Sequence, residues 1–421
     1  VMAKISVKVP DILLPNKSVD MSKWAVVACD QYTSEPEYWE GVKKATEGSP
    51  SALNVIFPEV YLSKDNAPII ESINKTMYEY LDTGVLQSIG EGFVLIERST
   101  PITPKRLGLV MAVDLEDYSF VREDKANIRA TEGTVVERIP PRVKIREHAP
   151  IELPHIMLLI DDRNKSVIEP LYENRDKLTK LYDFDLNMNG GHLRGWHVTD
   201  TAPVEKALAK LLDEDVLKEK YGSTDEVMLF AVGDGNHSLA TAKACWNNLK
   251  ATLSAEEQKN HPARYALVEV MNLHDEGLEF EPIFRSVFNV DTADFLDGLY
   301  KAVKDSGLKC DYKCYTYTTK DGRKDLMLPS NAAVAVGLVQ DFIDAYIKSH
   351  AGSEVDYVHG EDSLKQVTDA APNCVAITLP PLAKNDLFDY VLKVGAFPRK
   401  TFSMGEAFEK RYYVEARKII K

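Results

Sequence analysis

The stretch Leu229–Lys250, LFAVGDGNHSLATAKACWNNLK, joins an apolar run to an amphipathic one through a short polar segment. The apolar run Val227–Val232 is typical of a buried strand. Beyond the polar segment, apolar residues recur near helical spacing at Leu239, Ala242, Trp246 and Leu249. This spacing predicts a helix that packs one face against a sheet. A strand that leads through a loop into a helix is the building unit of α/β folds.

The polar segment Asp234–Ser238 carries more polar groups than a strand-to-helix turn requires. We expect Ser238 to be the N-cap of the helix, with free backbone N–H groups beyond it that attract anions. Gly235 lets the backbone approach a phosphate closely. His237 is suited to donate to that phosphate or to move a proton, and Asp234 to bind Mg²⁺ or act as a base. Asp-Gly-Asn is also a favourable tight-turn sequence, so the residues alone leave a purely structural interpretation open.

Strand-like and helix-like segments alternate along the rest of the chain, which predicts a mixed α/β fold. Strands are expected at residues 25–29, 92–100, 106–118 and 154–162, together with a strand pair in 309–329. Helices are expected from about residue 34 onward and at 69–86, 204–222, 291–307 and 406–420. Ser34 followed by Glu37 resembles a capping box for the first helix.

A boundary near Pro203 is expected to divide the chain into two α/β regions. The N-terminal region covers residues 1–202, and the C-terminal region, 203–421, carries the polar segment. At 421 residues the chain is long enough for more than one core.

The composition indicates a globular protein without a nucleic-acid or membrane partner. The net charge of -14 opposes binding to a phosphate backbone. No apolar run approaches the length of a membrane span, and the N-terminal segment lacks the pattern of a signal peptide. The five cysteines are scattered, and Cys310 and Cys314 have no second pair at zinc spacing. We therefore expect a cytoplasmic protein with neither zinc nor haem.

The polar segment resembles the D-G-x-H-R signature of the ParB/sulfiredoxin nucleotide-binding superfamily. Further segments resemble, in order, an uncharacterised family known as domain of unknown function 1015: residues 106–118, 128–162, 272–285, 355–367 and 395–413. The resemblance covers most of the chain from Ala25 onward. It implies a ParB/sulfiredoxin-like strand–loop–helix core with additional α/β elements, and nucleotide binding of the kind seen in CTP-dependent switches, sulfiredoxins and free-serine kinases.

The sequence departs from the family pattern where positive or titratable groups are expected. The common D-G-H-H-R becomes Asp234-Gly235-Asn236-His237-Ser238, so the signature arginine is missing. The usual H-E pair is Thr131-Glu132, and a P-T-H-R segment appears as Pro282-Ile283-Phe284-Arg285. A phosphate at this site would therefore need positive charge from another part of the chain.

Three other segments are candidates for that charge or for a supporting role. Arg138, Arg142 and Arg146 share a face if their segment is a helix, and Arg142, Lys144 and Arg146 do so if it is a strand. The resemblance places this row beside Glu132 and Thr134. The loop after Pro398 offers Arg399, Lys400, Thr401 and Ser403. The end of the first strand offers Asp30 and Tyr32.

These features together favour a nucleotide-dependent enzyme that transfers phosphate to a small hydroxylated metabolite. Asp234 would hold Mg²⁺ or act as base, His237 and the helix N-terminus with Gly235, Asn236 and Ser238 would hold phosphate, and Glu132 would be a second acid or base. The positive charge would come from Arg142, Arg146, Arg285 and Lys400. The alternative is a non-catalytic nucleotide or metabolite sensor, which the missing arginine favours. A DNA-associated role by analogy with ParB fits the acidic charge least.

Overall fold

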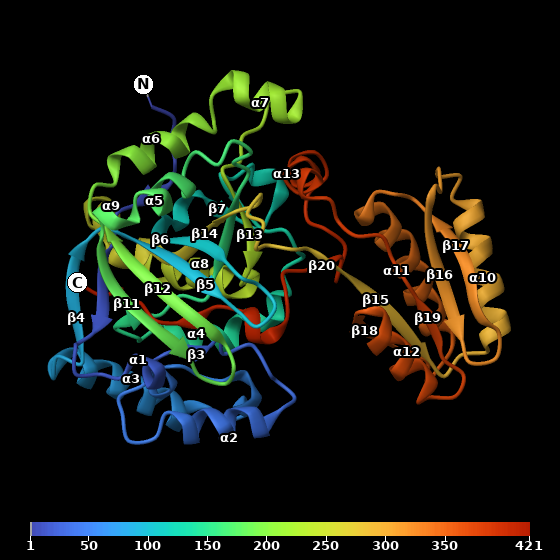
Figure 1. Ribbon diagram of the computed structural model, residues 1–421, viewed down its shortest axis with the longest axis horizontal. Helices are drawn as coiled ribbons and strands as arrows, with labels where there is room; N and C mark the ends of the chain where they lie inside the picture. Colours follow the sequence, from blue (N-terminus) through green and yellow to red (C-terminus); the bar gives the residue numbers. More distant parts are fainter. Residues whose placement is uncertain (1) are drawn as a thin grey trace. The chain divides into compact units, whose positions relative to one another are not determined.

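The computed structural model describes residues 2–421 and divides the chain into two compact units (Figure 1). Unit 1 comprises the chain up to Leu278 together with Leu392–Gly395 and Glu406–Lys421. Unit 2 comprises Glu279–Val391 and Ala396–Gly405. The boundary expected near Pro203 therefore lies inside unit 1, and the chain returns to unit 1 at its C-terminal end.

Unit 1 is built on a ten-stranded mixed sheet, which confirms the predicted mixed α/β class. Its order along the main path is β11-β12-β5-β6-β14-β10-β13-β8-β7, and β1 pairs with β6. The strands are β1 (Val7–Lys8), β5 (Phe93–Ser99), β6 (Arg106–Asp114), β7 (Tyr118–Ser119), β8 (Ile128–Arg129), β10 (Met157–Ile160), β11 (Thr179–Leu186), β12 (Gly191–Val198), β13 (Phe230–Asp234) and β14 (Tyr265–Asn272).

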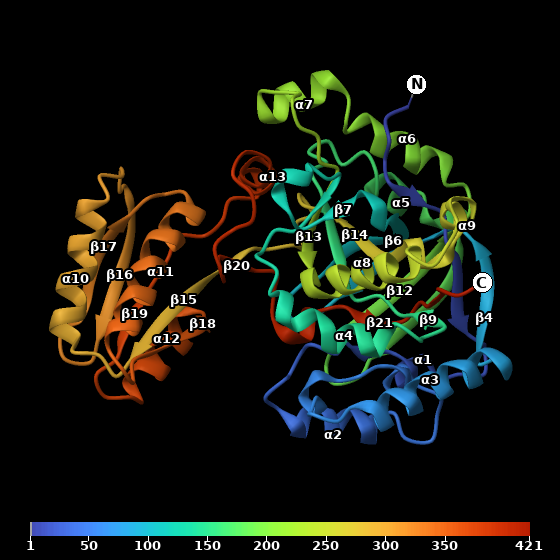
Figure 2. The same cartoon turned by 180° about the vertical axis from the view of Figure 1, so that it is seen from behind.

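Both faces of this sheet are buried, because alternate residues of its strands enter two separate cores. In β5, Phe93 and Leu95 belong to one core while Val94 and Ile96 belong to the other. The first core includes residues of α6 (Ala202–Lys210) and α8 (Asn236–Lys250). The second includes residues of α1 (Met21–Trp24), α2 (Pro36–Ala45) and α3 (Ala67–Asp82). The period of two along the strands thus accounts for a three-layer arrangement, seen from both sides in Figures 1 and 2.

The opening stretch forms the predicted strand, loop and helix, but the helix begins three residues earlier than expected. Its N-cap is Gly235 in the left-handed conformation, with φ 90° and ψ 30°, so the prediction of Ser238 as N-cap is wrong. Only glycine adopts this backbone readily, and a side chain there would meet Ile156 Cγ1 at 3.0 Å. Ser238 lies inside the first turn, which frees its hydroxyl for a contact elsewhere.

Two other helix predictions in unit 1 are corrected. Glu35 is the N-cap of α2 and makes no side-chain capping bond, so the Ser34–Glu37 capping box does not form. The helix expected at 204–222 is two helices, because the chain turns at Asp213 before α7 (Glu214–Tyr221) begins. Gly222 ends α7 with φ 74°.

The helix expected at 406–420 is also absent, and short strands stand in its place. Strand β21 (Tyr412–Tyr413) pairs with β3 (Val26–Val27), and β22 (Arg417–Lys418) pairs with β9 (Ile151–Glu152). The segment has helical propensity, but Tyr412, Tyr413, Val414 and Ala416 are all buried. Burial on both sides suits an extended segment between other strands, so tertiary pairing overrides local preference. The remaining elements of unit 1 are β2 (Asp11–Pro15), β4 (Leu86–Glu91), α4 (Ile139–Arg146), α5 (Glu169–Glu173) and α9 (Ala255–Asn260).

Unit 2 is a six-stranded sheet in the order β17-β16-β19-β15-β18, with β20 paired to β15. The predicted strand pair at 309–329 forms β16 and β17, and the expected helix at 291–307 forms α10. Its elements are β15 (Glu281–Phe288), α10 (Thr292–Asp305), β16 (Tyr312–Thr318), β17 (Gly322–Leu328), α11 (Ala332–Ser349), β18 (Glu354–His359), α12 (Glu361–Asp369), β19 (Val375–Ile377), α13 (Lys384–Lys393) and β20 (Phe402–Ser403).

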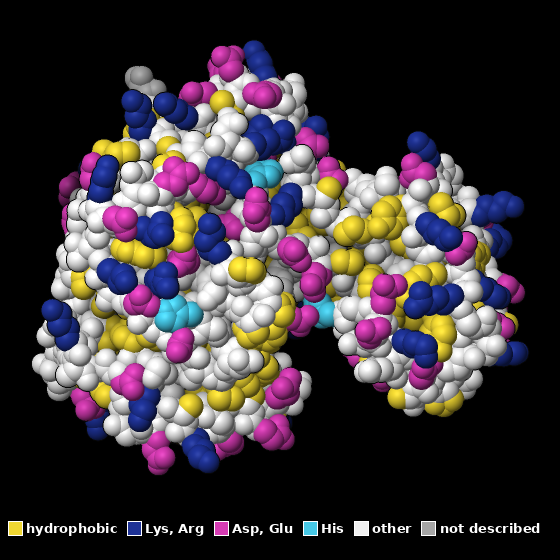
Figure 3. All heavy atoms as spheres, viewed as in Figure 1, with side chains coloured by type: hydrophobic (Ala, Val, Ile, Leu, Met, Phe, Trp, Pro, Cys, Tyr) yellow, Lys and Arg dark blue, Asp and Glu magenta, His cyan; other side chains and the backbone are white. Residues whose placement is uncertain are grey.

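On the surface of unit 1, Lys and Arg side chains are interspersed with Asp and Glu on the face that Figure 3 presents. In the described part of the chain, no helix combines the length and apolar character that crossing a membrane requires.

Replacing Gly191 with Ala tests the close approach of β12 to β5. Gly191 has φ 95°, and an added Cβ would clash with the backbone carbonyl of Ser99. We expect Gly191→Ala to lower the free energy of unfolding by about 3 kcal/mol or more, measured by urea denaturation. Gly222→Ala is the matched control, because Gly222 has φ 74° but nothing within 4 Å of an added Cβ. It should cost only about 1–2 kcal/mol, and equal losses would contradict the steric explanation.

Candidate functional site

The candidate site lies in unit 1 at the N-terminal end of α8. Since Gly235 has no side chain, it offers no cap to the N–H groups of the first helical turn. The side chain of Asn236 is buried and turns away from these groups, because its Oδ1 accepts a 3.3 Å hydrogen bond from the Thr131 N–H. The helix N-terminus is therefore left open to an anion.

The loop that follows β8 packs directly against this helix end. The Thr131 hydroxyl donates to the Val232 carbonyl at 2.6 Å, and the Val135 N–H donates to His237 Nε2 at 3.1 Å. Glu132 and Thr134 lie in this loop. The Oγ1 atom of Thr134 is buried and has no hydrogen-bond partner among the described residues. A donor from a ligand, or an acceptor, would satisfy this hydroxyl.

His237 is held in its neutral form. Burial lowers its pKa, and the positive charges of Arg138 and Arg142 lower it further, whereas Asp30 opposes them. Because Nε2 accepts the bond from Val135, the neutral ring carries its proton on Nδ1. His237 is thus a hydrogen-bond donor rather than a cation at neutral pH.

Asp234 is paired with a lysine that the sequence did not indicate. Asp234 Oδ2 lies 3.5 Å from Lys410 Nζ, and Oδ1 accepts from the Gly235 N–H at 3.0 Å. The side chain of Lys410 is only 13% exposed. Lys410 lies far along the chain, two residues before β21, and no motif marks it. It supplies a positive charge beside Asp234 at the end of β13.

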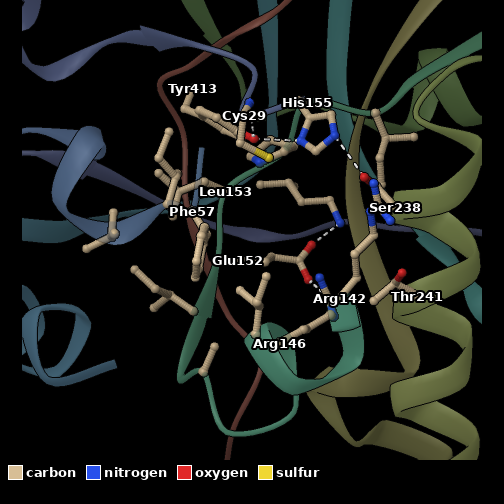
Figure 4. A pocket seen from close by; sticks show the side chains of 18 of the residues that line it. Cys29, Phe57, Arg142, Arg146, Glu152, Leu153, His155, Ser238, Thr241 and Tyr413 are labelled. Atoms are coloured by element: carbon tan, nitrogen blue, oxygen red, sulfur yellow. Dashed lines mark hydrogen bonds and ion pairs between the residues drawn. The ribbon is translucent and has the colours of Figure 1, made fainter. Parts of the chain in front are cut away.

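Ser238 and Asp30 meet a second residue that sequence reasoning missed, His155. Ser238 Oγ lies 2.8 Å from His155 Nε2, and the Tyr413 hydroxyl lies 2.8 Å from His155 Nδ1 (Figure 4). Asp30 Oδ2 is 4.0 Å from His155 Nε2. His155 directly precedes a buried strand in the sequence, and this position was its only signal. Tyr32 stacks on Tyr38, with ring centroids 3.6 Å apart, in the loop that begins at Asp30.

Of the two alternatives for the arginine row, the helix is correct. Arg142 and Arg146 lie on α4, and Arg138 is the N-cap of this helix. Both helical arginines are engaged with carboxylates. Arg142 Nη2 lies 2.5 Å from Glu59 Oε1, and Arg146 Nη2 lies 2.7 Å from Glu152 Oε2. These ion pairs leave the arginines half-buried beside the site rather than free in solvent.

A cavity of about 160 Å³ lies between these elements, next to α8. Most of its walls are apolar, and its polar groups cluster where α4, α8 and His155 meet (Figure 4). The apolar lining includes Val55, Ile56, Phe57, Leu62, Met77, Ile145, Ile151, Leu153, Ile156, Ala266 and Leu267. Ser238, Thr241, Arg142 and Arg146 also line it. An apolar chamber with a few convergent polar groups is typical of a small-molecule site.

The other predicted binding residues belong to unit 2, where they have structural contacts. Arg285 is fully buried, and its guanidinium donates to Gln340 Oε1 and to the carbonyls of Ile283, Arg399 and Lys400. Burial lowers the pKa of Arg285 to about 10. These bonds hold the turn after Pro398 in place. Arg285 is predicted to neutralise the charge of a ligand, but its guanidinium is already bonded to this turn.

The hydroxyls of that turn are likewise engaged within it. Thr401 Oγ1 donates to the Pro398 carbonyl at 2.7 Å, and Ser403 Oγ donates to the Gly405 carbonyl at 3.1 Å. Arg399 and Lys400 are exposed, and Arg399 Nη2 lies 3.6 Å from Asp344 Oδ1. A role of this turn in ligand binding stays a prediction.

Among residues 2–421 the structure contains no group of three or more His, Cys, Asp or Glu side chains arranged to hold a metal ion. Asp234 lies at the site with Lys410 as its ion-pair partner. Mg²⁺ at Asp234 therefore stays a prediction in which the phosphates of a nucleotide would supply the other ligands.

The family model described as "Protein of unknown function (DUF1015)" matches residues 13–346, and the chain belongs to this family. No curated protein matches the chain. The relationship to the ParB/sulfiredoxin superfamily stays a prediction.

Three solved structures show a distant likeness. A conserved hypothetical protein from Pyrococcus furiosus is 10% identical, with TM-score 0.36 and coverage of 74% of this chain and 95% of that one. A free serine kinase in complex with AMP is 8% identical, with TM-score 0.37 and coverage of 74% and 92%. SbnI with a C-terminal truncation, from Staphylococcus aureus, is 10% identical, with TM-score 0.32 and coverage of 73% and 81%. Likenesses at this level transfer neither a ligand nor a residue role.

The pKa of His237 provides a test of the site's electrostatics. We expect Arg138→Gln to raise the pKa of His237, because it removes a positive charge that disfavours the imidazolium. NMR titration of the imidazole resonances measures the change. Lys144→Gln, on the exposed side of α4, is the control and should leave the pKa unchanged. Equal shifts in the two variants would show that only net charge matters.

The same group fixes the direction of a stability change with pH. The folded pKa of His237 lies below the unfolded value of about 6.5, so the unfolded chain binds the proton first. Its contribution to stability is therefore complete above about pH 6.5 and is lost as the pH falls toward the folded pKa. We expect His237→Gln to flatten the pH dependence of the free energy of unfolding in that window. An unchanged slope would contradict a lowered pKa.

The structural role of Arg285 predicts a local effect of Arg285→Lys. Lysine cannot reach the four acceptors that the guanidinium fork bonds, so buried carbonyls lose their donors, at about 1–3 kcal/mol. Hydrogen exchange of β15 and of residues 399–401 should become about fivefold to a hundredfold faster. Arg323→Lys, at an exposed strand position of unit 2, should leave exchange there unchanged. Unchanged hydrogen exchange in Arg285→Lys would contradict the structural role of Arg285 and favour a ligand role.

Proposed function

We propose that the chain binds a nucleotide through its phosphates at the N-terminus of α8 and transfers a phosphoryl group to the hydroxyl of a small metabolite. The observation that carries the proposal is the open helix end, which Lys410 and neutral His237 flank within one unit. This combination supplies N–H donors, a point charge and an imidazole donor around one position.

The phosphate would lie over the first turn of α8. Gly235, in the αL conformation, has no side chain that would obstruct the phosphate. The helix dipole favours negative charge at this end of α8. His237 Nδ1–H and the partnerless Thr134 hydroxyl would each donate to a phosphate oxygen. Lys410 would exchange part of its interaction with Asp234 for one with the phosphate.

The transfer step needs a base for the acceptor hydroxyl and neutralisation of the charge on the transferred group. Asp234 and Glu132 are the carboxylates on the two segments that enclose the helix end. One would accept the proton of the acceptor hydroxyl, while Lys410 and the helix end stabilise charge on the equatorial oxygens. A nucleotide would bring Mg²⁺ with its phosphates, and Asp234 is the carboxylate nearest to it in this scheme. The apolar cavity beside α8 suits the body of a bound ligand.

A second candidate function is a non-catalytic nucleotide or metabolite sensor. The Asp234–Lys410 ion pair favours it, because a carboxylate held by lysine is less free to approach an acceptor hydroxyl. Ser238, which replaces the arginine of the resembling signature, faces His155 instead.

Calorimetric titration with a panel of adenine, cytosine, guanine and uracil nucleotides, with and without Mg²⁺, tests the binding step. We expect Lys410→Met to raise the Kd of the preferred nucleotide about tenfold to a hundredfold, as expected for loss of a charged contact. Lys64→Met, at an exposed position of unit 1, is the matched control and should leave the Kd unchanged. Absence of nucleotide binding by the unmodified chain would overturn both the enzyme and the nucleotide sensor.

Product analysis with candidate hydroxy compounds separates the two functions. An enzyme should form a phosphorylated product, and Glu132→Gln or Asp234→Asn should lower the rate about 10²–10⁴-fold if that residue is the base. Since both changes preserve shape, nucleotide affinity should fall far less than turnover. Tight binding with no product from any acceptor would support the sensor.

A further inference from the structure

The side chains of Ser238, His155 and Tyr413 form a hydrogen-bonded row that the proposed phosphate site does not use. That site uses the backbone of the first turn of α8, whereas the row runs from the Ser238 side chain away from the helix (Figure 4). Ser238 Oγ and His155 Nε2 are 2.8 Å apart, and His155 Nδ1 and the Tyr413 hydroxyl are also 2.8 Å apart. His155 and Tyr413 are both buried.

The row has a consistent set of donors and acceptors that leaves His155 Nε2 as a base. Tyr413 accepts from the Cys29 N–H at 3.1 Å. The phenol oxygen has a second lone pair, which accepts from His155 Nδ1–H in the tautomer that we assign. His155 Nε2 is then unprotonated and accepts from the Ser238 hydroxyl. A base held by a third group next to a hydroxyl is the arrangement that activates a serine nucleophile.

The row opens into the apolar cavity. Ser238, His155, Tyr413 and Cys29 all line this chamber of about 160 Å³. Ser238 also lies in the first turn of α8, where the positive end of the helix dipole stabilises a developing negative charge. Cys29 does not compete as the nucleophile, because burial raises the pKa of its thiol and keeps it protonated.

We infer that Ser238 is an acyl-accepting nucleophile with His155 as its general base, and that the chain hydrolyses esters of short or aromatic carboxylic acids in this cavity. The inference is independent of the proposed phosphoryl transfer. The cavity is similar in size to engineered apolar cavities of about 150 Å³ that hold benzene, so it suits a small acyl group rather than a long fatty chain.

The reaction balances with water as the second reactant. Ser238 Oγ forms a bond to the ester carbonyl carbon while its proton moves to His155 Nε2. The bond from that carbon to the alkoxy oxygen breaks, and His155 returns the proton to the leaving alcohol. Water then attacks the acyl-serine with His155 again accepting a proton, which releases the carboxylic acid and restores Ser238. Asp30, 4.0 Å from His155 Nε2, stabilises the imidazolium formed in each half.

Tyr413 is a positioning residue in this scheme, because it holds His155 in the required tautomer without touching the ester. We expect Tyr413→Phe to lower kcat for p-nitrophenyl butyrate about tenfold to a hundredfold while leaving KM unchanged. A purely structural role would instead reduce the number of active chains, so kcat divided by the fraction of chains that the fluorophosphonate labels at Ser238 would equal that of the unmodified chain.

The test uses the full chain with an alkyl fluorophosphonate and with p-nitrophenyl butyrate. Mass spectrometry should find one phosphonyl group per chain, on Ser238, and the ester should release p-nitrophenol. Ser238→Ala should abolish both, and His155→Gln should slow both about 10²–10⁴-fold. Ser72→Ala, an exposed serine of α3, is the matched control and should react like the unmodified chain.

Several outcomes would overturn the inference. These are a folded but unreactive chain, labelling at a residue other than Ser238, and ester hydrolysis that persists in Ser238→Ala. A thermal melt identifies variants that fail to fold, and Ser238→Ala and His155→Gln must both melt like the unmodified chain. Faster turnover of p-nitrophenyl palmitate than of the butyrate would contradict the cavity as the acyl site. Nucleotide titration of Ser238→Ala keeps the two functions separate, because alanine retains the backbone N–H that the phosphate site uses.

Discussion

The buried ion pair between Arg411 and Glu415 holds the C-terminal segment of unit 1 in place, and the candidate site depends on it. The two charged groups lie 2.6 Å apart, and Glu415 is 0% exposed. Burial alone would lower the pKa of Arg411, but Glu415 and Glu269 raise it above its ordinary value. The guanidinium also donates to the Pro154 and Tyr412 carbonyls. Removing one member of such a pair costs about 3–5 kcal/mol, because the other charge stays buried.

Residues on either side of Arg411 reach the site from this anchored segment. Lys410 faces Asp234 at the end of β13, and Tyr413 faces His155. A second buried pair, between Arg417 and Glu152, fixes the segment further along, and Glu152 in turn holds Arg146 on α4. Buried charges that must be paired thus set the register of an extended segment, and that register places the site's lysine and tyrosine.

The first turn of α8 offers two different chemistries on its backbone and on its side chains. Its N–H groups and the open glycine cap form a surface suited to phosphate, and His237 stays neutral beside them. The hydroxyl of Ser238 points instead into an apolar chamber, where His155 meets it. Because the left-handed Gly235 starts the helix three residues earlier than its polar residues suggest, Ser238 is released from capping and becomes available for chemistry.

The sequence by itself determined the elements whose pattern is local. The apolar runs of β5 and β6 and the strand and helix around Gly235 follow from neighbouring residues, whereas the sequence left the arginine row on α4 open between a helix and a strand. The residues of the polar segment were also identifiable, because they follow a strand at an end where sites form, and Glu132 and Thr134 were indicated by the family resemblance. Only the tertiary structure decided which groups meet them. Lys410, His155 and Tyr413 carry no motif, and the segment 406–420 has helical propensity yet is extended, because burial between other strands outweighs local preference.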